Sequence, residues 1–244
     1  MSRDVRELDW QQFQNHRFLQ PSPDLSPYVA RYWDVTWDYT RPYWQLVVPY
    51  PNVHLSFGDG AAQLHGVSSR HVVRELVGAG RVFGVAFQPG CFRPFLGKPV
   101  QSLTDRAIPA LEVFPKLPDH ADVQTVEGLL RKNLPPPDPR AEQATAVVNR
   151  IITEPAIKRV DMFAEECNTS VRGLQRLFAE HVGVGPKWVI RRYRLHEVTQ
   201  RMEAREPIEW AALAADLGYA DQAHLVRDFS AMFGESPTQY AARY

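Results

Sequence analysis

The sequence predicts a two-domain α+β protein, in which an antiparallel β domain precedes an all-α domain. Three observations support this prediction. Runs of alternating apolar residues occupy much of residues 1–133, prolines interrupt the chain at 134–140, and the segments within 141–244 have helical spacing. A chain of 244 residues is long enough for two domains of ordinary size.

The first domain is predicted from its strand patterns. The segment PNVHLSF alternates apolar and polar residues, and GRVFGVAF alternates large apolar residues with small ones. Alternation with period two is typical of strands, and the Gly and Pro residues between the runs are typical of turns. Before the prolines, HADVQTVEGLLRKNL places its apolar residues on one side of a helix. We therefore expect the β domain to end in a helix.

The segment LPPPDPR separates the two domains. Three consecutive prolines and a fourth at Pro139 favour an extended, semi-stiff spacer and disfavour a helix. The expected boundaries are a β domain at 1–133, a linker at 134–140 and a helical domain at 141–244.

Composition restricts the class of protein. The chain is 44% hydrophobic and 23% charged, and no apolar run approaches the length of a membrane span. The first residues, MSRDVRELDWQQF, lack the apolar core of a secretion signal, and two widely separated cysteines favour the reducing cytoplasm. Basic and acidic residues number 28 each, and residues 140–244 contain 14 of each, so any basic surface must be local.

The segment DMFAEECNTSVRGLQRLFAEH predicts a helix, a tight turn and a second helix. Asn168 tolerates the left-handed conformation of a turn, and Ser170 is a favourable N-cap. A helix-turn-helix of this kind can place its second helix in the major groove of DNA. The outward-facing residues of this second helix are Val171, Arg172, Gln175 and Arg176.

The segment LAADLGYADQAHLVRDFSAMF repeats the arrangement, with Gly218 ending one helix and Asp221 capping the next. Arg176 and Arg227 lie 51 positions apart in equivalent places, so the unit is duplicated. The segment between the units, PKWVIRRYRLHEVTQRM, predicts one connecting helix. The outward-facing residues of the second unit include Gln222, Ala223, His224 and Arg227.

Residues 141–244 closely resemble the DNA-binding domain of AraC/XylS-type transcriptional regulators. The resemblance rests on Leu-Gln-Arg-x-Phe at 174–178, Arg-Leu at 194–195, and Gly-Tyr…Phe…Gly-x-Ser-Pro…Tyr at 218–240. It implies two recognition helices in successive major grooves, contact with RNA polymerase, a homodimer, and a first domain that is a jelly-roll-like or cupin-like sensor. Residues 25–108 resemble the N-terminal segment of a less studied subset of these regulators, and that likeness names no effector.

The resemblance and the residue types together predict the DNA contacts. Arg can bind guanine and Gln adenine, each good pair being worth roughly 1–3 kcal/mol, while basic residues of the connecting helix contact phosphate. Gly173 and Ala223 shorten the two recognition surfaces and Asp228 adds a negative charge to the second, so the first unit is better equipped to read bases. For each helix the alternative is a merely solvated face, and for Arg194 it is a structural role. The expected contacts are Val171, Arg172, Gln175, Arg176, Lys187, Arg191, Arg192, Gln222, His224 and Arg227.

Aromatic residues are dense in the first domain and can line an apolar pocket with a few polar anchors. The alternative is that most of them form the core. His65, His71 and Glu75 match no dependable metal-ligand spacing, so neither a metal nor another cofactor is expected. Redox sensing by Cys91, placed in a Gly/Pro loop and expected to be the more exposed cysteine, or by Cys167 is a minor alternative. The expected ligand-binding residues are Trp33, Trp44, His54, Phe57, Phe87 and Arg93.

The sequence therefore predicts a cytoplasmic transcriptional regulator that binds double-stranded DNA and is controlled by a small-molecule effector in its first domain. The residues leave open whether it is an activator or a repressor. One alternative is a protein–protein adaptor that kept the fold without DNA binding, favoured by the neutral helical domain and Asp228. The other is an enzyme with a DNA-binding tail, which no Ser/His/Asp set, phosphate loop or metal spacing supports. We expect neither an enzyme nor a membrane protein.

Overall fold

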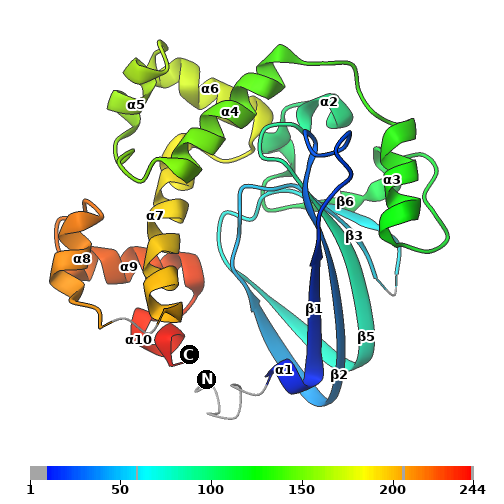
Figure 1. Cartoon of the computed structure of the whole chain (residues 1–244), viewed down its shortest axis with the longest axis horizontal. Coiled ribbons are helices and arrows are strands. Elements are labelled where there is room, and N and C mark those ends of the chain that lie inside the picture. The colour runs from blue at the N-terminus through cyan, green and yellow to red at the C-terminus, as the bar shows by residue number, and fades with distance from the viewer. Residues whose placement is uncertain (1–9, 59, 205–206, 243–244) are drawn as a thin grey trace.

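The computed structural model describes residues 10–58, 60–204 and 207–242 (Figure 1). An antiparallel β domain is followed by a helical domain that lies beside it. The predicted α+β architecture is therefore confirmed. The prediction that no secretion signal is present concerns mainly residues 1–9, which lie outside the described residues. No helix of the described ranges has both the length and the apolar character needed to cross a membrane.

The described strands form a single antiparallel sheet in the order β1-β2-β5-β3-β4-β6. Its long central pair, β2 and β5, has breaks in register between Val29 and Arg31 and between Tyr39 and Tyr43. A jelly roll divides its strands between two sheets, whereas helices cover the core face of this single sheet. The strands are β1 (Gln14–Leu19), β2 (Val29–Val47), β3 (His54–Phe57), β4 (Gln63–His65), β5 (Val72–Phe87) and β6 (Ala107–Pro109).

The two faces of the sheet differ in chemistry, because successive side chains of a strand point to opposite faces. One row of cross-strand partners is fully buried beneath α3 (Val123–Lys132) and consists of Tyr32, Val85, Leu55 and Leu64. The adjacent row, on the opposite face, consists of Arg31, Ala86, His54 and His65. Figure 1 shows α7 on this second side of the sheet and α3 on the first.

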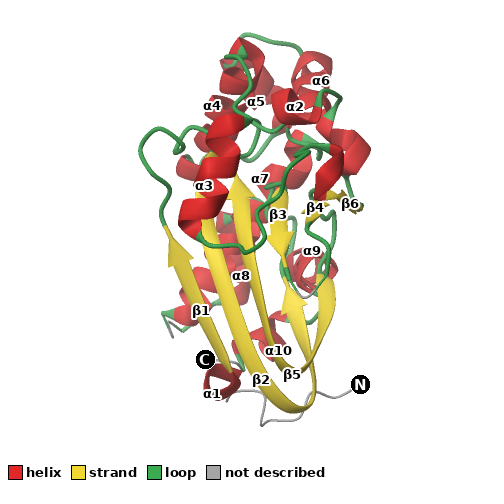
Figure 2. Ribbon diagram, turned by 90° about the vertical axis from the view of Figure 1, so that its right-hand side faces the viewer, coloured by secondary structure: helices red, strands yellow, loops and turns green. Residues whose placement is uncertain are grey.

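The predicted helix before the linker is α3, and Figure 2 shows it lying across the upper end of the long strands. The buried carboxylate of Glu127 fixes it to the β domain. This carboxylate accepts hydrogen bonds from the backbone N–H and the hydroxyl of Ser22 at 2.8 and 2.5 Å and pairs with Arg131 at 3.0 Å. The shorter helices of this domain are α1 (Trp10–Phe13), α2 (Arg93–Leu96) and the 3-10 helices η2 (Val100–Leu103) and η3 (Ala110–Glu112).

The extended spacer is shorter than the predicted linker, because α4 already begins at Pro139. Proline is well tolerated at the first helical position, where its missing N–H would have no intrahelical partner. The carboxylate of Asp138 caps this helix by accepting from the N–H of Arg140 at 2.9 Å. The helical domain contains α4 (Pro139–Thr153), α5 (Val160–Glu166), α6 (Val171–His181), α7 (Pro186–Glu203), α8 (Trp210–Asp216), α9 (Gln222–Phe233) and α10 (Pro237–Ala241).

Helix α7 joins two separate cores. Its first half, through Val189 and Ile190, packs with α4, α5 and α6, and its second half packs with α8, α9 and α10. Each core also receives a residue of the β domain, since Val67 lies within the first and Val48 packs against the second. The two domains are therefore packed together, which the proline-rich linker did not predict.

Candidate nucleic-acid interface

The first helix-turn-helix unit consists of α5, a tight turn and α6. Asn168 in the turn has a positive φ of 50°, which asparagine adopts more readily than most residues. The hydroxyl of Ser170 accepts a hydrogen bond from the backbone N–H of Gly173 at 3.0 Å and so caps α6. Leu174 and Phe178 bury the inner face of this helix. The predicted turn and cap are confirmed.

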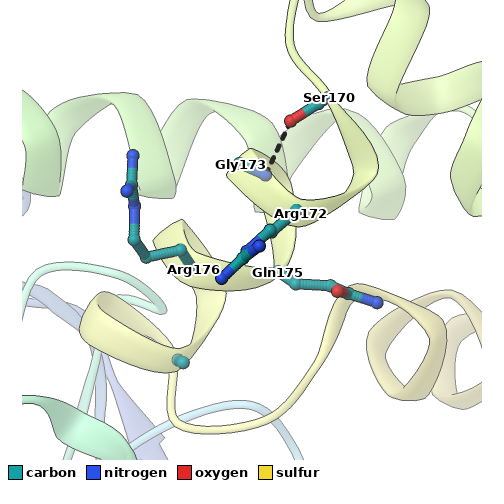
Figure 3. A pocket seen from close by; sticks show the side chains of 6 residues that line it. Ser170, Arg172, Gly173, Gln175 and Arg176 are labelled. Carbon is teal, nitrogen blue, oxygen red and sulfur yellow. Dashed lines mark hydrogen bonds between the residues drawn. The ribbon is translucent and has the colours of Figure 1, made fainter.

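The outer face of α6 bears an open hollow of about 480 Å³ (Figure 3). Gly173 lines this hollow, and a larger residue would be crowded there, because a Cβ at this position would lie 2.5 Å from the hydroxyl oxygen of Thr169. Figure 3 shows the side chains of Arg172, Gln175 and Arg176 projecting from the helix around this hollow. Three of the predicted contacts are therefore adjacent and exposed, and Val171 is 38% exposed at the start of the same helix.

The second unit consists of α8, a turn and α9. Gly218 has a φ of 73° at the end of α8, and the carboxylate of Asp221 caps α9 by accepting from the N–H of His224 at 2.7 Å. Gln222, His224 and Arg227 are exposed on the first turns of α9. The duplication predicted from the sequence is thus present, with corresponding residues exposed on both second helices.

The basic residues of α7 do not share one environment. Lys187 is exposed in the first turn. Arg191 is only partly exposed, and its Nη1 atom lies 3.5 Å from a carboxylate oxygen of Asp228 on α9. Arg194 donates a hydrogen bond to the carbonyl of Lys158 at 2.7 Å. These contacts within the protein leave Lys187 as the freest of the predicted phosphate contacts on this helix.

The prediction that Arg192 contacts DNA is wrong for this arrangement, because its side chain is 1% exposed. Its Nε atom donates to the carbonyl of Pro49 at 2.6 Å, and its guanidinium lies 4.1 Å from the centre of the Tyr50 ring and 5.4 Å from that of Phe233. Pro49 and Tyr50 belong to the β domain, so this arginine connects the domains. Arg192 lies three residues from both Val189 and Leu195, so helical spacing places it on the buried side of α7, a signal that the sequence analysis did not use.

The residues predicted to bind a ligand do not line one pocket. Trp33 and His54 do lie together, with the indole N–H donating to the imidazole Nδ1 at 3.3 Å. Phe57 and Phe87 pack into the core on the other face of the sheet. Each lies an odd number of residues from His54 or Ala86 on its own strand, and these two residues face α7. Trp44 is 48% exposed near the far end of the long strands. Arg93 begins α2, where its Nε atom is buried without a hydrogen-bond partner among the described residues.

Two arginines lie near the Tyr50 ring, one from the β domain and one from α7. Arg31 lies 5.6 Å from the centre of the Tyr50 ring, on the side chain that Arg192 also contacts. The Nε atom of Arg31 and the Nη1 atom of Arg192 are buried and find no hydrogen-bond partner within the described ranges. Burial, and then the charge of Arg31, lowers the pKa of His54 to about 4, while burial and then Arg192 lower the pKa of His196. We call Arg31, Tyr50 and Arg192 the arginine pair site. The sequence analysis did not predict this site. The available signal was that Arg31 and Trp33, two positions apart, share one face of β2.

The cysteines do not support a redox sensor. Cys91 is 5% exposed, which corrects the expectation that it is the more exposed cysteine, and its thiol lies 3.1 Å from the carbonyl of Tyr28. Burial raises the pKa of Cys91 to about 12 and also raises the pKa of Cys167, so neither thiol is activated. The described residues contain no group of three or more His, Cys, Asp or Glu placed to hold a metal ion.

Two protein-family models match the chain, one in the β domain and one in the helical domain. Residues 17–109 match a domain of unknown function (DUF6597), and residues 163–243 match a helix-turn-helix domain. No match was found among curated proteins. The second match coincides with the two units described above, and the first covers most of the sheet.

The solved structures that resemble the chain include ToxT from Vibrio cholerae. A 1.65 Å structure of ToxT has a TM-score of 0.41 and 12% identity over 95% of this chain and 98% of that one. A complex of ToxT with (E)-4-(8-methylnaphthalen-1-yl)but-3-enoic acid has a TM-score of 0.44 and 11% identity over 95% and 99%. ToxT bound to an unsaturated fatty acid has a TM-score of 0.37 and 11% identity over 93% and 94%.

Proposed function

The chain combines a DUF6597 domain with an AraC-type helix-turn-helix domain, and on this premise we propose that it is a sequence-specific DNA-binding regulator of transcription. One observation carries the proposal. Two capped helices, α6 and α9, each follow a short helix and a tight turn, and one helix, α7, joins their two cores. Both expose polar side chains on their first turns, where recognition helices contact base edges.

The contacts proposed for the first unit are the more extensive. Arg172 and Arg176 can each bind guanine through two hydrogen bonds, and Gln175 can bind adenine. Gln222, His224 and Arg227 would read the second site, and Lys187 would contact phosphate. Each base contact is expected to contribute roughly 1–3 kcal/mol to discrimination.

Selection of bound DNA fragments, followed by footprinting at two salt concentrations, tests this proposal. We expect protection of two adjacent major grooves and a steep loss of affinity with salt, because bound phosphates release counterions. Arg176→Ala should weaken binding about 5- to 150-fold and relax the sequence preference in the first groove. Arg41→Ala, which removes an exposed charge from β2, is the matched control. Binding without sequence preference or salt dependence would favour the adaptor alternative.

We also propose that the effector is a small organic anion held at the arginine pair site. A buried guanidinium with an unpaired N–H is costly, and carboxylate and phosphate groups are the partners that arginine binds best. Arg31 and Arg192 both present such an atom beside Tyr50, one from each domain. An anion bound there would favour arrangements in which α7 stays packed on the β domain, and so would alter DNA affinity.

Thermal melting with a panel of carboxylic acids and phosphate monoesters tests the effector proposal. Each acid is compared with its neutral methyl ester, since only the charged form should stabilise the protein, by RT ln(1 + [L]/Kd). Arg31→Gln and Arg192→Met should abolish the response, whereas Arg41→Gln should keep it. A response that persists in both variants would place the ligand elsewhere.

The remaining functional assignments follow from the resemblance to AraC-type regulators. We propose that the protein acts in the cytoplasm, as an activator that contacts RNA polymerase, and that it forms a homodimer. Transcription in vitro with purified polymerase, together with sedimentation of the free and DNA-bound protein, would test the activation and the dimer.

A further inference from the structure

Asp228 occupies an unexpected position on the second recognition helix. It follows Arg227 directly, and from the sequence its carboxylate should repel the phosphates of bound DNA. In the structure a carboxylate oxygen of Asp228 instead lies 3.5 Å from Nη1 of Arg191 on α7, with both side chains more than half buried. A partly buried pair of this kind is screened less than a surface pair.

Tyr219, in the turn between α8 and α9, completes the group. The residue is 6% exposed, and its hydroxyl is buried without a hydrogen-bond partner among the described residues. Burial, and then the nearby negative charge of Asp228, raises the pKa of Tyr219. The rings of Tyr219 and His224 of α9 pack edge to face, with their centres 5.1 Å apart.

The same tyrosine is connected to the first unit. The guanidinium of Arg194 lies 5.2 Å from the centre of the Tyr219 ring and donates to the carbonyl of Lys158, which precedes α5. The side chain of Lys158 in turn lies against Gly218 and donates to the carbonyl of Asp216, at the end of α8. A chain of hydrogen bonds and ring contacts therefore runs from the start of the first unit to the second recognition helix.

We propose that Asp228 is a positioning residue of the second recognition helix. Held by Arg191, its carboxylate fixes the orientation of α9 relative to α7 and therefore relative to α6. This inference rests on the proposed DNA-binding function, since that function requires both helices to enter their grooves together.

The direction in which neutralisation of Asp228 changes the affinity for DNA distinguishes this proposal from simple repulsion. A carboxylate that repelled phosphate would weaken binding, and its neutralisation would raise the affinity for DNA. A carboxylate that positions α9 gives the opposite result, because Asp228→Asn keeps the shape of the side chain but removes the charge that Arg191 holds. The loss should be confined to the groove that α9 reads.

The experiment compares the full-length wild type with Asp228→Asn on two duplexes, one with both half-sites and one with the first half-site alone. We expect about tenfold weaker binding to the full site, equal to 1.4 kcal/mol, with loss of protection in the second groove. Binding to the first half-site should stay within about twofold. Glu180→Gln, which removes the same charge from α6, should not weaken either complex.

Two further measurements make the outcome decisive. The double variant Arg191→Asp with Asp228→Arg reverses the pair and should restore much of the second-groove protection. Without DNA, hydrogen exchange in α9 should be faster in Asp228→Asn than in wild type, whereas exchange in α6 should not change. This measurement tests the positioning role even if wild type binds no specific site and the regulator proposal fails. Higher affinity in Asp228→Asn, equal losses in both grooves, or unchanged exchange in α9 would overturn the inference.

Discussion

The guanidinium of Arg192 packs 4.1 Å from the centre of the Tyr50 ring and donates to the neighbouring carbonyl of Pro49. A residue of the helix that joins the two DNA-reading units is thereby held by the β domain. Any rotation of α7 away from the sheet must break this contact.

Substitutions at Arg192 should separate its packing from its charge. Arg192→Ala removes the contacts with Tyr50 and Phe233 and leaves a cavity, so we expect a loss of about 2–4 kcal/mol in the free energy of unfolding. Arg192→Met keeps most of the volume without a buried charge and should stay within about 1 kcal/mol of wild type or exceed it. Urea denaturation measures both values. Equal losses in the two variants would show that the charge, rather than the packing, stabilises this contact.

Each N-cap of the two recognition helices should affect the protection of one groove only. Ser170→Ala leaves the N–H of Gly173 without its partner, and we expect a loss of about 1 kcal/mol in stability and weaker protection of the first groove only. Asp221→Ala should do the same for the second groove. Ser170→Asp, which keeps an acceptor at the cap, is the control and should retain most of the stability. A loss as large in this control as in Ser170→Ala would contradict the capping explanation.

His54 should make stability depend on pH. Its folded pKa of about 4 lies below the ordinary value of 6.5, so between these values the unfolded chain binds a proton that the folded chain does not. The stabilisation is therefore fully present above pH 6.5 and is lost as the pH falls towards 4, by on the order of 1–3 kcal/mol. Denaturation at several pH values should show a smaller slope for His54→Gln than for wild type. An unchanged slope would mean that other histidines, such as His65 and His196, account for the effect.

Gly84 should not tolerate a side chain, because a Cβ there would lie 2.1 Å from the Trp33 ring. Gly84→Ala must displace this indole and break its contact with His54. We expect a loss of about 1–3 kcal/mol and a shift in tryptophan fluorescence. Gly60→Ala is the matched control, since no atom lies within 4 Å of its added Cβ. Unchanged fluorescence in Gly84→Ala would show that the ring can move without cost.

The features that sequence analysis predicted correctly depend on short-range chemistry. Asn168, Ser170, Gly218 and Asp221 act on the backbone within a few residues, so their types alone indicated both helix-turn-helix units. The alternation in PNVHLSF and GRVFGVAF indicated β3 and the end of β5 in a similar way.

The features that it missed depend on contacts between distant segments. Arg192 belongs to the same basic run as Lys187, but it lies on the buried side of α7, where Tyr50 and Phe233, both distant in the sequence, pack against its guanidinium. Aromatic density suggested a single ligand pocket, but the alternation of β3 and β5 sends Phe57 and Phe87 to the opposite face from His54. The negative charge of Asp228 was read as a repulsive group because its partner on α7 could not be known.

The sharing of core residues between domains limits how this protein could be recombined with others. Val67 completes the first helical core and Val48 covers the second, although both belong to the β half of the chain. The helical half, transplanted behind an unrelated sensor, would expose apolar surface at both positions unless the new partner supplied equivalent residues. In evolution the two halves are therefore expected to change together, with substitutions in the β domain compensated in the helical cores rather than inherited independently.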